Sequence, residues 1–322
     1  MTTLVFLEQH EGELQKGALG VLGRAASLGD DEVAGAIVGA GASALAAEAG
    51  RHGAAKVWVA EGEALQAPLP QPRVDVLAKI IEAGGYDTVL FGGSVLAADV
   101  AAGLAARLDA GVNWDVIDLV HEDGRLIGKR PALGDSVLVD VGWKGTPAIA
   151  IVRAGTFEPV ETGGEAEVVE APTALEDFSS AARMLEQAHE EQAGPSIEEA
   201  DVIVAGGRGL GGPENFALVE ELAKALGGAV AATRAVVDAG WYPYAAQVGQ
   251  TGKSVSPRLY VACGISGAIQ HKVGMQGSNV IVAINKDANA PIFEYSDLGV
   301  VGDLHQVVPK LTELVRAKKG AA

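Results

Sequence analysis

Short apolar runs alternate with amphipathic stretches along the first half of the chain, and this alternation limits the possible folds more than any other feature. The runs typical of buried strands are residues 4–7, 33–38, 57–60 and 88–91. The stretches with helical periodicity are residues 18–28, 43–50, 74–83 and 97–108. Strands and helices in regular alternation are typical of a parallel sheet with flanking helices. The sequence therefore predicts an α/β fold that begins with a mostly parallel sheet.

The pattern changes after Asp109. Residues 125–127, 136–143 and 148–153 are short runs without a helical period, and Gly-Asp, Lys-Gly and Thr-Pro pairs lie among them. Such runs are typical of antiparallel hairpins. We expect these hairpins to close the first sheet.

Composition and charge exclude several classes of protein. The 322 residues are enough for two domains of roughly 100 to 200 residues each, and 48% apolar residues argue against intrinsic disorder. A formal charge of −18 disfavours nucleic acid and anionic membrane surfaces as partners. Residues 1–10 lack a signal-peptide pattern, and no apolar run is long enough for membrane insertion. The single cysteine, Cys263, fits a reducing compartment, so we expect a cytoplasmic protein.

The charge is divided unevenly along the chain. Residues 1–200 hold 13 basic and 32 acidic residues, whereas residues 201–322 hold 11 basic and 10 acidic residues. The stretch 158–199 has twelve acidic residues and one basic residue, and we expect it to connect the two halves. The predicted division is an N-terminal α/β domain, an acidic linker and a C-terminal α/β dinucleotide-binding domain, at 1–185, 186–200 and 201–322.

A glycine-rich turn opens the second half. Gly207, Gly209 and Gly212 satisfy G-x-G-x-x-G after an apolar run and before an amphipathic stretch, a geometry in which free amides and a helix dipole receive phosphate. A nicotinamide site needs an acidic residue at the end of the next strand, but that strand ends in Thr233-Arg234. This difference argues against an NAD-type dehydrogenase, and a glycine-rich turn without a ligand is the plain alternative.

Three more segments carry polar groups suited to a ligand. The loop 247–254 offers two glutamines, two glycines and two hydroxyls, which suit the edge of a flat heteroaromatic ring. Gly264 follows an apolar run, and we expect Ser266 to cap a helix whose first amides face an anion. The run 279–287 ends in polar residues, as strands that line a crevice do. Together these segments predict an anionic, extended ligand with an aromatic head, although each residue alone has a structural explanation.

The second half resembles the FAD domain of the electron transfer flavoprotein alpha subunit. The segments that carry this resemblance are Gly206-Gly-Arg-Gly-Leu, Thr233-Arg-Ala-Val-Val-Asp-Ala-Gly, Gln247-Val-Gly-Gln-Thr-Gly-Lys, Gly264-Ile-Ser-Gly-Ala-Ile-Gln-His, Val282-Ala-Ile-Asn-Lys-Asp and Ala290-Pro-Ile-Phe. The first half resembles the family's N-terminal domain more loosely, through Val152-Arg-Ala-Gly-Thr-Phe. The resemblance implies one FAD in this chain, a heterodimer with a beta subunit that the N-terminal domain contacts, and AMP or a second FAD in that partner.

The resemblance also implies a set of site residues but no catalytic residue and no metal. Arg208 and residues 266–271 are expected at the pyrophosphate and ribityl chain, and Asn285, Asp303 and Leu304 at the adenosine. Residues 248–251 are expected beside the isoalloxazine, with Arg234 over the ring, the Thr251 hydroxyl near N5 and His271 near O2. The full expected set is Arg208, Thr233, Arg234, Gln247, Val248, Gly249, Gln250, Thr251, Gly264, Ser266, Gly267, Ala268, Ile269, Gln270, His271, Asn285, Asp303 and Leu304.

These residues suit an electron carrier that converts no substrate of its own. It is expected to accept electrons from primary dehydrogenases and to pass them to an acceptor oxidoreductase. A charge-assisted hydrogen bond contributes roughly 1.5 to 3 kcal/mol, and ~1.4 kcal/mol equals ~59 mV for one electron, so Arg234 and His271 are expected to raise the first reduction potential by tens to more than a hundred millivolts. Two alternatives are an NAD(P)-dependent dehydrogenase with Arg234 on a 2′-phosphate, and a ligand-free scaffold.

Overall fold

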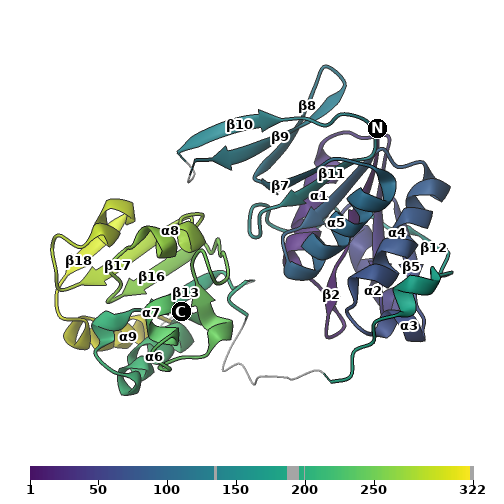
Figure 1. The fold of residues 1–322 in the computed structure, drawn as a ribbon. Helices are drawn as coiled ribbons and strands as arrows, with labels where there is room; N and C mark the ends of the chain where they lie inside the picture. The colour runs from purple at the N-terminus through teal and green to yellow at the C-terminus, as the bar shows by residue number, and fades with distance from the viewer. Residues whose placement is uncertain (134–135, 187–195, 199, 320–322) are drawn as a thin grey trace. The chain divides into compact units, whose positions relative to one another are not determined.

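The computed structural model describes residues 1–133, 136–186, 196–198 and 200–319. The chain forms two compact units, Met1–His189 and Glu190–Ala322 (Figure 1). Most of the predicted linker, 186–200, lies outside the described residues. Within it, Ile197 is described and packs into the core of the second unit.

The first unit is built on a seven-stranded parallel sheet. Its strands are β1 (Thr2–Phe6), β4 (Glu32–Val38), β5 (Lys56–Ala60), β6 (Thr88–Gly92), β7 (Val112–Val116), β11 (Ala148–Val152) and β12 (Glu167–Glu170). Their order across the sheet is β12-β5-β4-β1-β6-β11-β7, and every pair is parallel. The alternation of strands and helices therefore predicted the main sheet correctly. A two-stranded hairpin, β2 (Gln9–His10) and β3 (Glu13–Leu14), follows β1.

Helices cover both faces of this sheet. They are α1 (Lys16–Ser27), α2 (Ala42–Arg51), α3 (Glu63–Gln66), α4 (Pro70–Gly84) and α5 (Val95–Leu108). Alternate residues of β1 enter opposite cores, because successive side chains of a strand point to opposite faces. Val5 packs with α1 and α2, whereas Leu4 packs with α4 and α5. The sheet is therefore buried on both sides.

The segment after α5 corrects the prediction of closing hairpins. Strands β8 (Asp118–Glu122), β9 (Arg125–Ala132) and β10 (Val137–Val141) form a separate antiparallel sheet in the order β10-β9-β8. In contrast, β11 runs parallel between β6 and β7, so the hairpin expected at 148–153 was wrong. All five residues of β11 are buried, and a continuous apolar run is typical of a parallel strand covered on both faces.

The acidic stretch that starts at residue 158 is not a connection along its whole length. Its segment β12 pairs with β5 at the edge of the first sheet. Short 3-10 helices lie here and in the second unit, at Asp177–Ser180, Arg208–Leu210, Pro213–Asn215, Tyr244–Ala246 and Pro291–Tyr295. The charge pattern marked the change of unit but did not distinguish an acidic edge strand from a linker.

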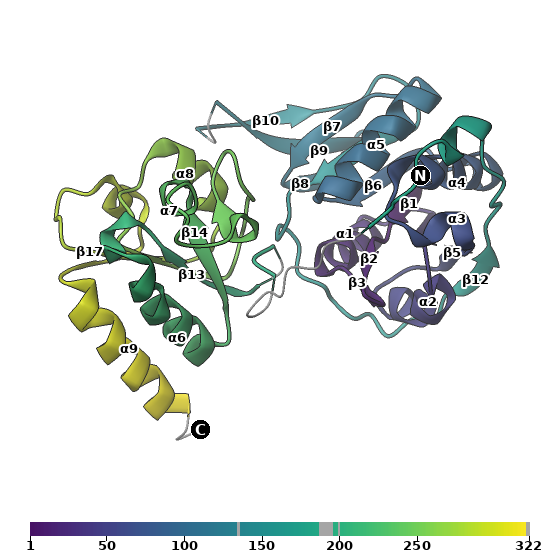
Figure 2. The same cartoon turned by 60° about the horizontal axis from the view of Figure 1, so that its bottom comes forward.

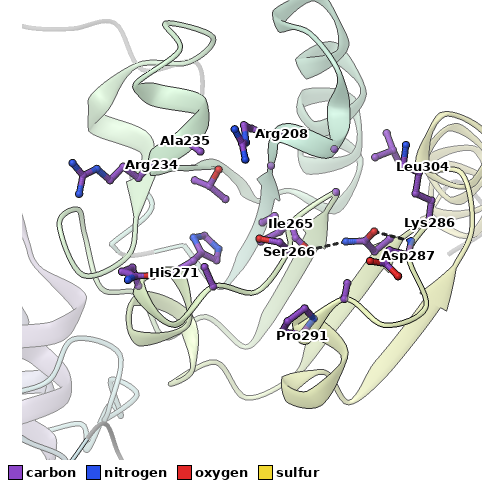
Figure 3. Close-up of a pocket in the computed structure, with 18 of the residues that line it drawn as sticks. Arg208, Arg234, Ala235, Ile265, Ser266, His271, Lys286, Asp287, Pro291 and Leu304 are labelled. Carbon is purple, nitrogen blue, oxygen red and sulfur yellow. Dashed lines mark hydrogen bonds between the residues drawn. The ribbon is translucent and has the colours of Figure 1, made fainter.

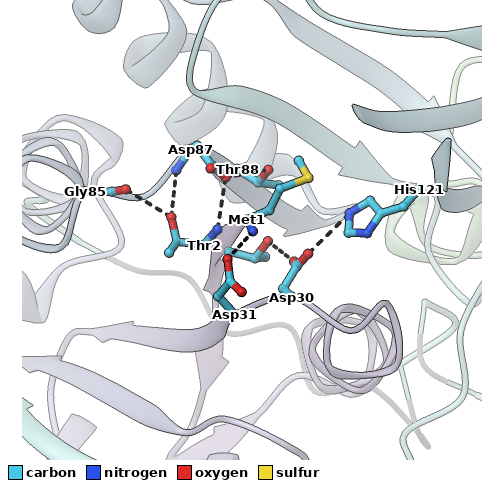
Figure 4. A network of polar contacts seen from close by, with 9 residues as sticks. Met1, Thr2, Asp30, Asp31, Gly85, Asp87, Thr88 and His121 are labelled. Atoms are coloured by element: carbon cyan, nitrogen blue, oxygen red, sulfur yellow. Dashed lines mark hydrogen bonds and ion pairs between the residues drawn. The ribbon is translucent and has the colours of Figure 1, made fainter. Parts of the chain in front are cut away.

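Polar contacts tie the amino terminus and the antiparallel sheet to the first sheet (Figure 4). The amino group of Met1 lies 2.7 Å from the Asp31 carboxylate. The Thr2 hydroxyl donates to the Gly85 carbonyl at 3.0 Å. His121 of β8 lies 3.3 Å from the almost fully buried carboxylate of Asp30, which precedes β4. These contacts hold β8 against the turn that leads into β4.

The second unit has a six-stranded parallel sheet. Its strands are β13 (Val202–Gly206), β14 (Ala229–Thr233), β15 (Gln247–Val248), β16 (Leu259–Cys263), β17 (Ile281–Asn285) and β18 (Leu298–Val301). Its helices are α6 (Phe216–Leu226), α7 (Arg234–Val237), α8 (Ile269–Met275) and α9 (Leu304–Lys319). The strand order is β15-β14-β13-β16-β17-β18. Helices α6 and α9 pack side by side on one face (Figure 2), and α8 packs on the other.

Two further properties of the whole chain concern its surroundings and its chemistry. None of the helices in the described part of the chain is long and apolar enough to cross a membrane. The single cysteine, Cys263, ends β16 without any exposed surface. Burial raises the pKa of its thiol to about 12, so the thiol is uncharged and poorly reactive at neutral pH.

Candidate functional site

The order of the strands in the second unit creates a crevice at the carboxyl edge of its sheet. After β13 the chain passes to β14 on one side, and it later returns to β16 on the other side. The loops that follow β13 and β16 therefore leave in opposite directions, and ligands of open α/β sheets bind where this occurs. A cavity of about 860 Å³ opens at this edge, within the range of roughly 300–1,000 Å³ that small-molecule sites occupy.

The cavity brings together a large part of the predicted site (Figure 3). The predicted residues that line it are Arg208, Thr233, Arg234, Gly264, Ser266, Ala268, Gln270, His271, Asn285, Asp303 and Leu304. The other predicted residues, which do not line it, are Gln247, Val248, Gly249, Gln250, Thr251, Gly267 and Ile269. The wall therefore includes the ends of β13, β14, β16, β17 and β18.

The floor of the cavity is a direct contact between two glycine-rich loops. The Gly207 N–H donates to the Cys263 carbonyl and the Gly209 N–H to the Gly264 carbonyl, both at 2.9 Å. A Cβ atom on Gly207 would lie 2.4 Å from the Gly264 oxygen, so only glycine permits this approach. The expectation of free amides at Gly207 and Gly209 was wrong, because both amides hold the loops together.

The loop after β16 offers the free donors instead. Within the described residues, the N–H groups of Ser266, Gly267 and Ala268 donate to no acceptor. Gly267 has a φ of +88°, and a Cβ atom there would lie 2.3 Å from the Ile292 nitrogen. Ser266 does not cap a helix as expected, since α8 begins at Ile269 with Ala268 before it. Three successive N–H groups without acceptors are suited to bind an anion.

Two arginines line the cavity, and they differ in their ionic contacts. Arg208 is exposed and forms the first turn after β13. Arg234 lies with its Nε 3.3 Å from the Asp238 carboxylate, and both side chains are more than half exposed. In Figure 3 the Arg234 side chain extends away from the other lining residues. Arg208 and Lys286 both line the cavity without an ion pair among the described residues, whereas Arg234 shares its charge with Asp238.

His271 is the buried titratable group of the wall. Its Nδ1 lies 3.0 Å from the Val248 carbonyl and its Nε2 lies 3.0 Å from the Tyr260 hydroxyl. Burial lowers its pKa to about 4, although the bond to Val248 opposes this shift. The imidazole is therefore neutral at pH 7, and both of its nitrogens are engaged within the protein. The expectation of a charge-assisted hydrogen bond from His271 was wrong, because burial keeps the ring uncharged.

The loop predicted to flank the isoalloxazine is held together by its own donors. Gln247 is buried, and its side-chain nitrogen lies 3.0 Å from the Thr251 carbonyl and 3.2 Å from the Thr251 hydroxyl oxygen. The Gln250 N–H donates to the Gln270 carbonyl at 2.7 Å. Because Gln247 donates to the Thr251 oxygen, the hydroxyl proton of Thr251 is left to donate elsewhere.

The residues predicted at the adenosine end have structural roles as well. The Asn285 amide nitrogen donates to the Ile265 carbonyl at 2.9 Å, and its oxygen accepts from the Asp287 N–H at 3.0 Å. The Asp303 carboxylate accepts from the His305 N–H at 3.0 Å, at the start of α9. These bonds fix the loops after β17 and β18 at the cavity wall.

The cavity fits a dinucleotide such as FAD. Its volume suits a ligand of that class, and the N–H groups of Ser266 and Ala268, which line it and have no acceptor among the described residues, suit the pyrophosphate together with Arg208. The loop after β14 carries no acidic residue at its first two positions, where a nicotinamide site has one.

Comparisons with known proteins agree with this geometry. Residues 3–176 match the electron transfer flavoprotein domain, and residues 196–276 match the electron transfer flavoprotein FAD-binding domain. The electron transfer flavoprotein subunit alpha of Mycobacterium tuberculosis (strain ATCC 25618 / H37Rv) is 46% identical over 321 residues, which cover 98% of this chain and 99% of that protein. The chain belongs to the electron transfer flavoprotein alpha-subunit family. Its relative in Mycobacterium leprae is 43% identical over 98% of this chain and 99% of that protein. Protein FixB of Clostridium saccharobutylicum is 40% identical, with 95% and 94% covered.

Membership of the electron transfer flavoprotein alpha-subunit family confirms the resemblance seen in the sequence. It also confirms the two-sheet α/β fold, FAD as the cofactor and the function of a FAD-binding electron carrier. The dehydrogenase and scaffold alternatives are set aside by the match along almost the full chain.

Sequence reasoning missed part of the cavity wall. Gly207 and Gly209 were predicted at a phosphate site, although with free amides. The lining residues that sequence reasoning did not assign are Ala235, Asp238, Ile265, Lys286, Asp287, Ala290, Pro291, Gly302 and His305. Most of them adjoin predicted residues. The sequence therefore indicated which strand ends line the cavity, but not how many residues after each strand contribute to the wall. Asp238 had a signal of its own, since it follows Arg234 by four residues and opposite charges at that spacing pair on one helical turn.

Proposed function

We propose that this alpha subunit pairs with an electron transfer flavoprotein beta subunit, accepts electrons from primary dehydrogenases and passes them to a respiratory or other acceptor oxidoreductase. The observation that supports this most is the cavity at the carboxyl edge of the second sheet, with its row of free N–H groups. The partner is expected to hold AMP or a second FAD. The division into an N-terminal domain, 1–185, a linker, 186–200, and a FAD domain, 201–322, is part of the proposal.

The residues divide by the part of FAD that they suit. Arg208 and the N–H groups at 266–268 bind the pyrophosphate, because charge-assisted donors are the strongest partners of phosphate. Asn285, Asp303 and Leu304 enclose the adenosine. Arg234, Thr251 and His271 act at the isoalloxazine edge. When bound, FAD supplies reversible transfer of single electrons, and the protein supplies orientation, donors and exclusion of water.

The cytoplasmic location is likewise proposed. A buried cysteine thiol and the absence of a second cysteine for a disulfide suit a reducing compartment.

Co-expression with the beta subunit of the same source tests this function. We expect one alpha and one beta chain in a complex that carries FAD absorbance, reduced by a dehydrogenase and its substrate. Acid extraction then identifies the nucleotide of the beta subunit. An alpha subunit that purifies without the beta subunit and carries no flavin would contradict the proposal.

Arg208→Ala tests the pyrophosphate contact. A lost charge-assisted hydrogen bond of roughly 1.5 to 3 kcal/mol corresponds to about 10- to 150-fold weaker FAD binding, measured by fluorescence titration of the apo complex. Arg316→Ala is the matched control, because Arg316 is an exposed arginine of the same unit that pairs with Glu221 on α6. Equal affinity for the two variants would remove Arg208 from the site.

A further inference from the structure

Tyr260 is a buried polar side chain behind the cavity wall that the proposed function does not use. It lies on β16, has no exposed surface and is one of the largest fully buried side chains of the protein. Its hydroxyl lies 3.0 Å from His271 Nε2, with the ring centroids 6.1 Å apart. His271 itself lines the cavity. Tyr260 does not line the cavity and contacts the wall through His271.

The direction of each proton follows from the chemistry of the acceptors. A carbonyl oxygen can only accept, so His271 Nδ1 carries a proton and donates it to Val248. In a neutral imidazole Nε2 is then bare, and the Tyr260 hydroxyl donates to it. Burial lowers the pKa of His271 and raises the pKa of Tyr260, and both shifts keep the pair uncharged.

Loss of either hydrogen bond of His271, to Val248 or to Tyr260, would destabilise the folded protein. A buried nitrogen without a partner loses the hydrogen bond that water provided in the unfolded chain. Two bonds to opposite sides of the imidazole also define the plane of the ring, whereas one bond leaves it free to turn about that contact. The Tyr260 hydroxyl thus controls the orientation of the ring that the wall presents to the cavity.

We propose that Tyr260 is a positioning residue of the cofactor site, whose hydroxyl donates to Nε2 and holds His271 as a fixed, neutral Nδ1–H imidazole. This inference rests on the proposed function in one respect, namely that His271 faces the isoalloxazine. It adds a residue behind the wall, on a strand whose sequence shows only an apolar run.

Tyr260→Phe in the alpha–beta complex tests the inference, because it removes the hydroxyl and keeps the ring. The matched control is Tyr242→Phe, since Tyr242 is a tyrosine of the same unit whose hydroxyl lies 3.3 Å from Glu220, on α6. Two readouts are needed. Nitrogen-15 NMR of labelled histidines reports which His271 nitrogen carries the proton and whether Nε2 accepts a hydrogen bond. A redox titration and the visible spectrum report the surroundings of the flavin.

We expect wild-type His271 to show a protonated Nδ1 and a hydrogen-bonded, bare Nε2. Tyr260→Phe should shift the Nε2 resonance towards that of an unbonded nitrogen and retain FAD. It should shift the first reduction equilibrium at least threefold, which is about 28 mV for one electron, because a neutral imidazole acts on the ring through the direction of its dipole and a loosely held imidazole no longer fixes that direction. Tyr242→Phe should match the wild type in both readouts.

Each alternative result has a distinct meaning. A protonated Nε2 in the wild type overturns the proposal without any variant. The proposal therefore stays testable even if Tyr260→Phe fails to fold. An Nε2 shift with an unchanged reduction equilibrium and spectrum overturns the role at the cofactor. A wild-type complex without FAD instead contradicts the proposed function, and the NMR readout still decides the Tyr260 contact.

Discussion

Arg234 shows how one neighbour moderates a charge at the cavity. Its guanidinium is 3.3 Å from the Asp238 carboxylate and largely exposed. Solvent screens exposed charges, and a paired carboxylate offsets part of the field of the cation. The position of Arg234 near the cavity could be predicted, because it directly follows β14. Its pairing with Asp238 and its exposure could not, because they depend on how the chain turns into α7.

Arg234→Ala is expected to lower the first reduction potential of the bound flavin. The loss should be tens of millivolts rather than more than a hundred, because the charge is exposed and shared with Asp238. Redox titration of the complex measures it, with Arg316→Ala as the control for a lost arginine far from the wall. A potential equal to that of the control would show that the guanidinium does not act on the ring.

His271 predicts how stability depends on pH. Its folded pKa of about 4 lies below the usual value of ~6.5 in an unfolded chain, so unfolding takes up a proton between these values. The stabilisation is fully present above pH ~6.5 and is lost as the pH falls towards 4, by up to about 3 kcal/mol. Urea unfolding of the apoprotein at pH 7.5 and 5.0 should show this loss. His271→Gln should lack it, and parallel pH dependences would contradict the assignment.

At the scale of elements, the contact between the strand-end loops determines the shape of the cavity. Gly267 combines a φ of +88° with a position where a Cβ atom would lie 2.3 Å from the Ile292 nitrogen, whereas Gly240 has a φ of +72° and open space around it. Gly267→Ala therefore adds a clash to the strain that both positions share.

We expect Gly240→Ala to cost roughly 1 kcal/mol from backbone strain alone. Gly267→Ala should cost clearly more and should also weaken FAD binding, because the loop after β16 must move. Denaturant unfolding and FAD titration of both variants provide the comparison. If the two variants lose the same stability and bind FAD equally, the close packing at Gly267 has no consequence for the site.

The sequence predicted elements best where periodicity was unambiguous. The runs 33–38 and 88–91 became β4 and β6 almost residue for residue. The run that became β11 was misassigned because a short apolar segment has no period that separates a buried parallel strand from a hairpin strand. Ser266 was misassigned as a cap for a related reason, since the backbone reaches α8 only after two further residues.

The sequence predicted which residues lie at the site, but not the tertiary contacts that these residues make. The strand-end positions of Arg208, Ser266 and Asn285 follow from the topology of a parallel sheet. The pairing of Tyr260 with His271 joins residues of β16 and α8, and no local pattern announces it. The hydrogen bonds that the Gly207 and Gly209 amides donate to Cys263 and Gly264 could not be predicted either, because they depend on where the loop after β16 lies.

At the scale of the whole molecule, FAD should stabilise the two units unequally. Each unit has hydrophobic clusters of its own, and all the described residues that line the cavity belong to the second. A ligand at 100 times its dissociation constant adds about 2.7 kcal/mol to the state that binds it. We expect FAD to slow hydrogen exchange in the strands of the second unit, measured by mass spectrometry.

The first unit is the internal reference for that measurement. Its peptides between residues 1 and 186 should exchange at nearly the same rate with and without FAD. Equal protection of β1 and β13 would mean that the cofactor stabilises the chain as one cooperative body and would contradict the expectation.

The depth of Cys263 makes the native protein a convenient starting point for spectroscopy. Its thiol is fully buried and its pKa is raised, so maleimide dyes and spin labels should leave it untouched under native conditions. A cysteine introduced at an exposed position of either unit would then be the one that reacts. Labels could be attached in pairs without first deleting the buried cysteine at the end of β16.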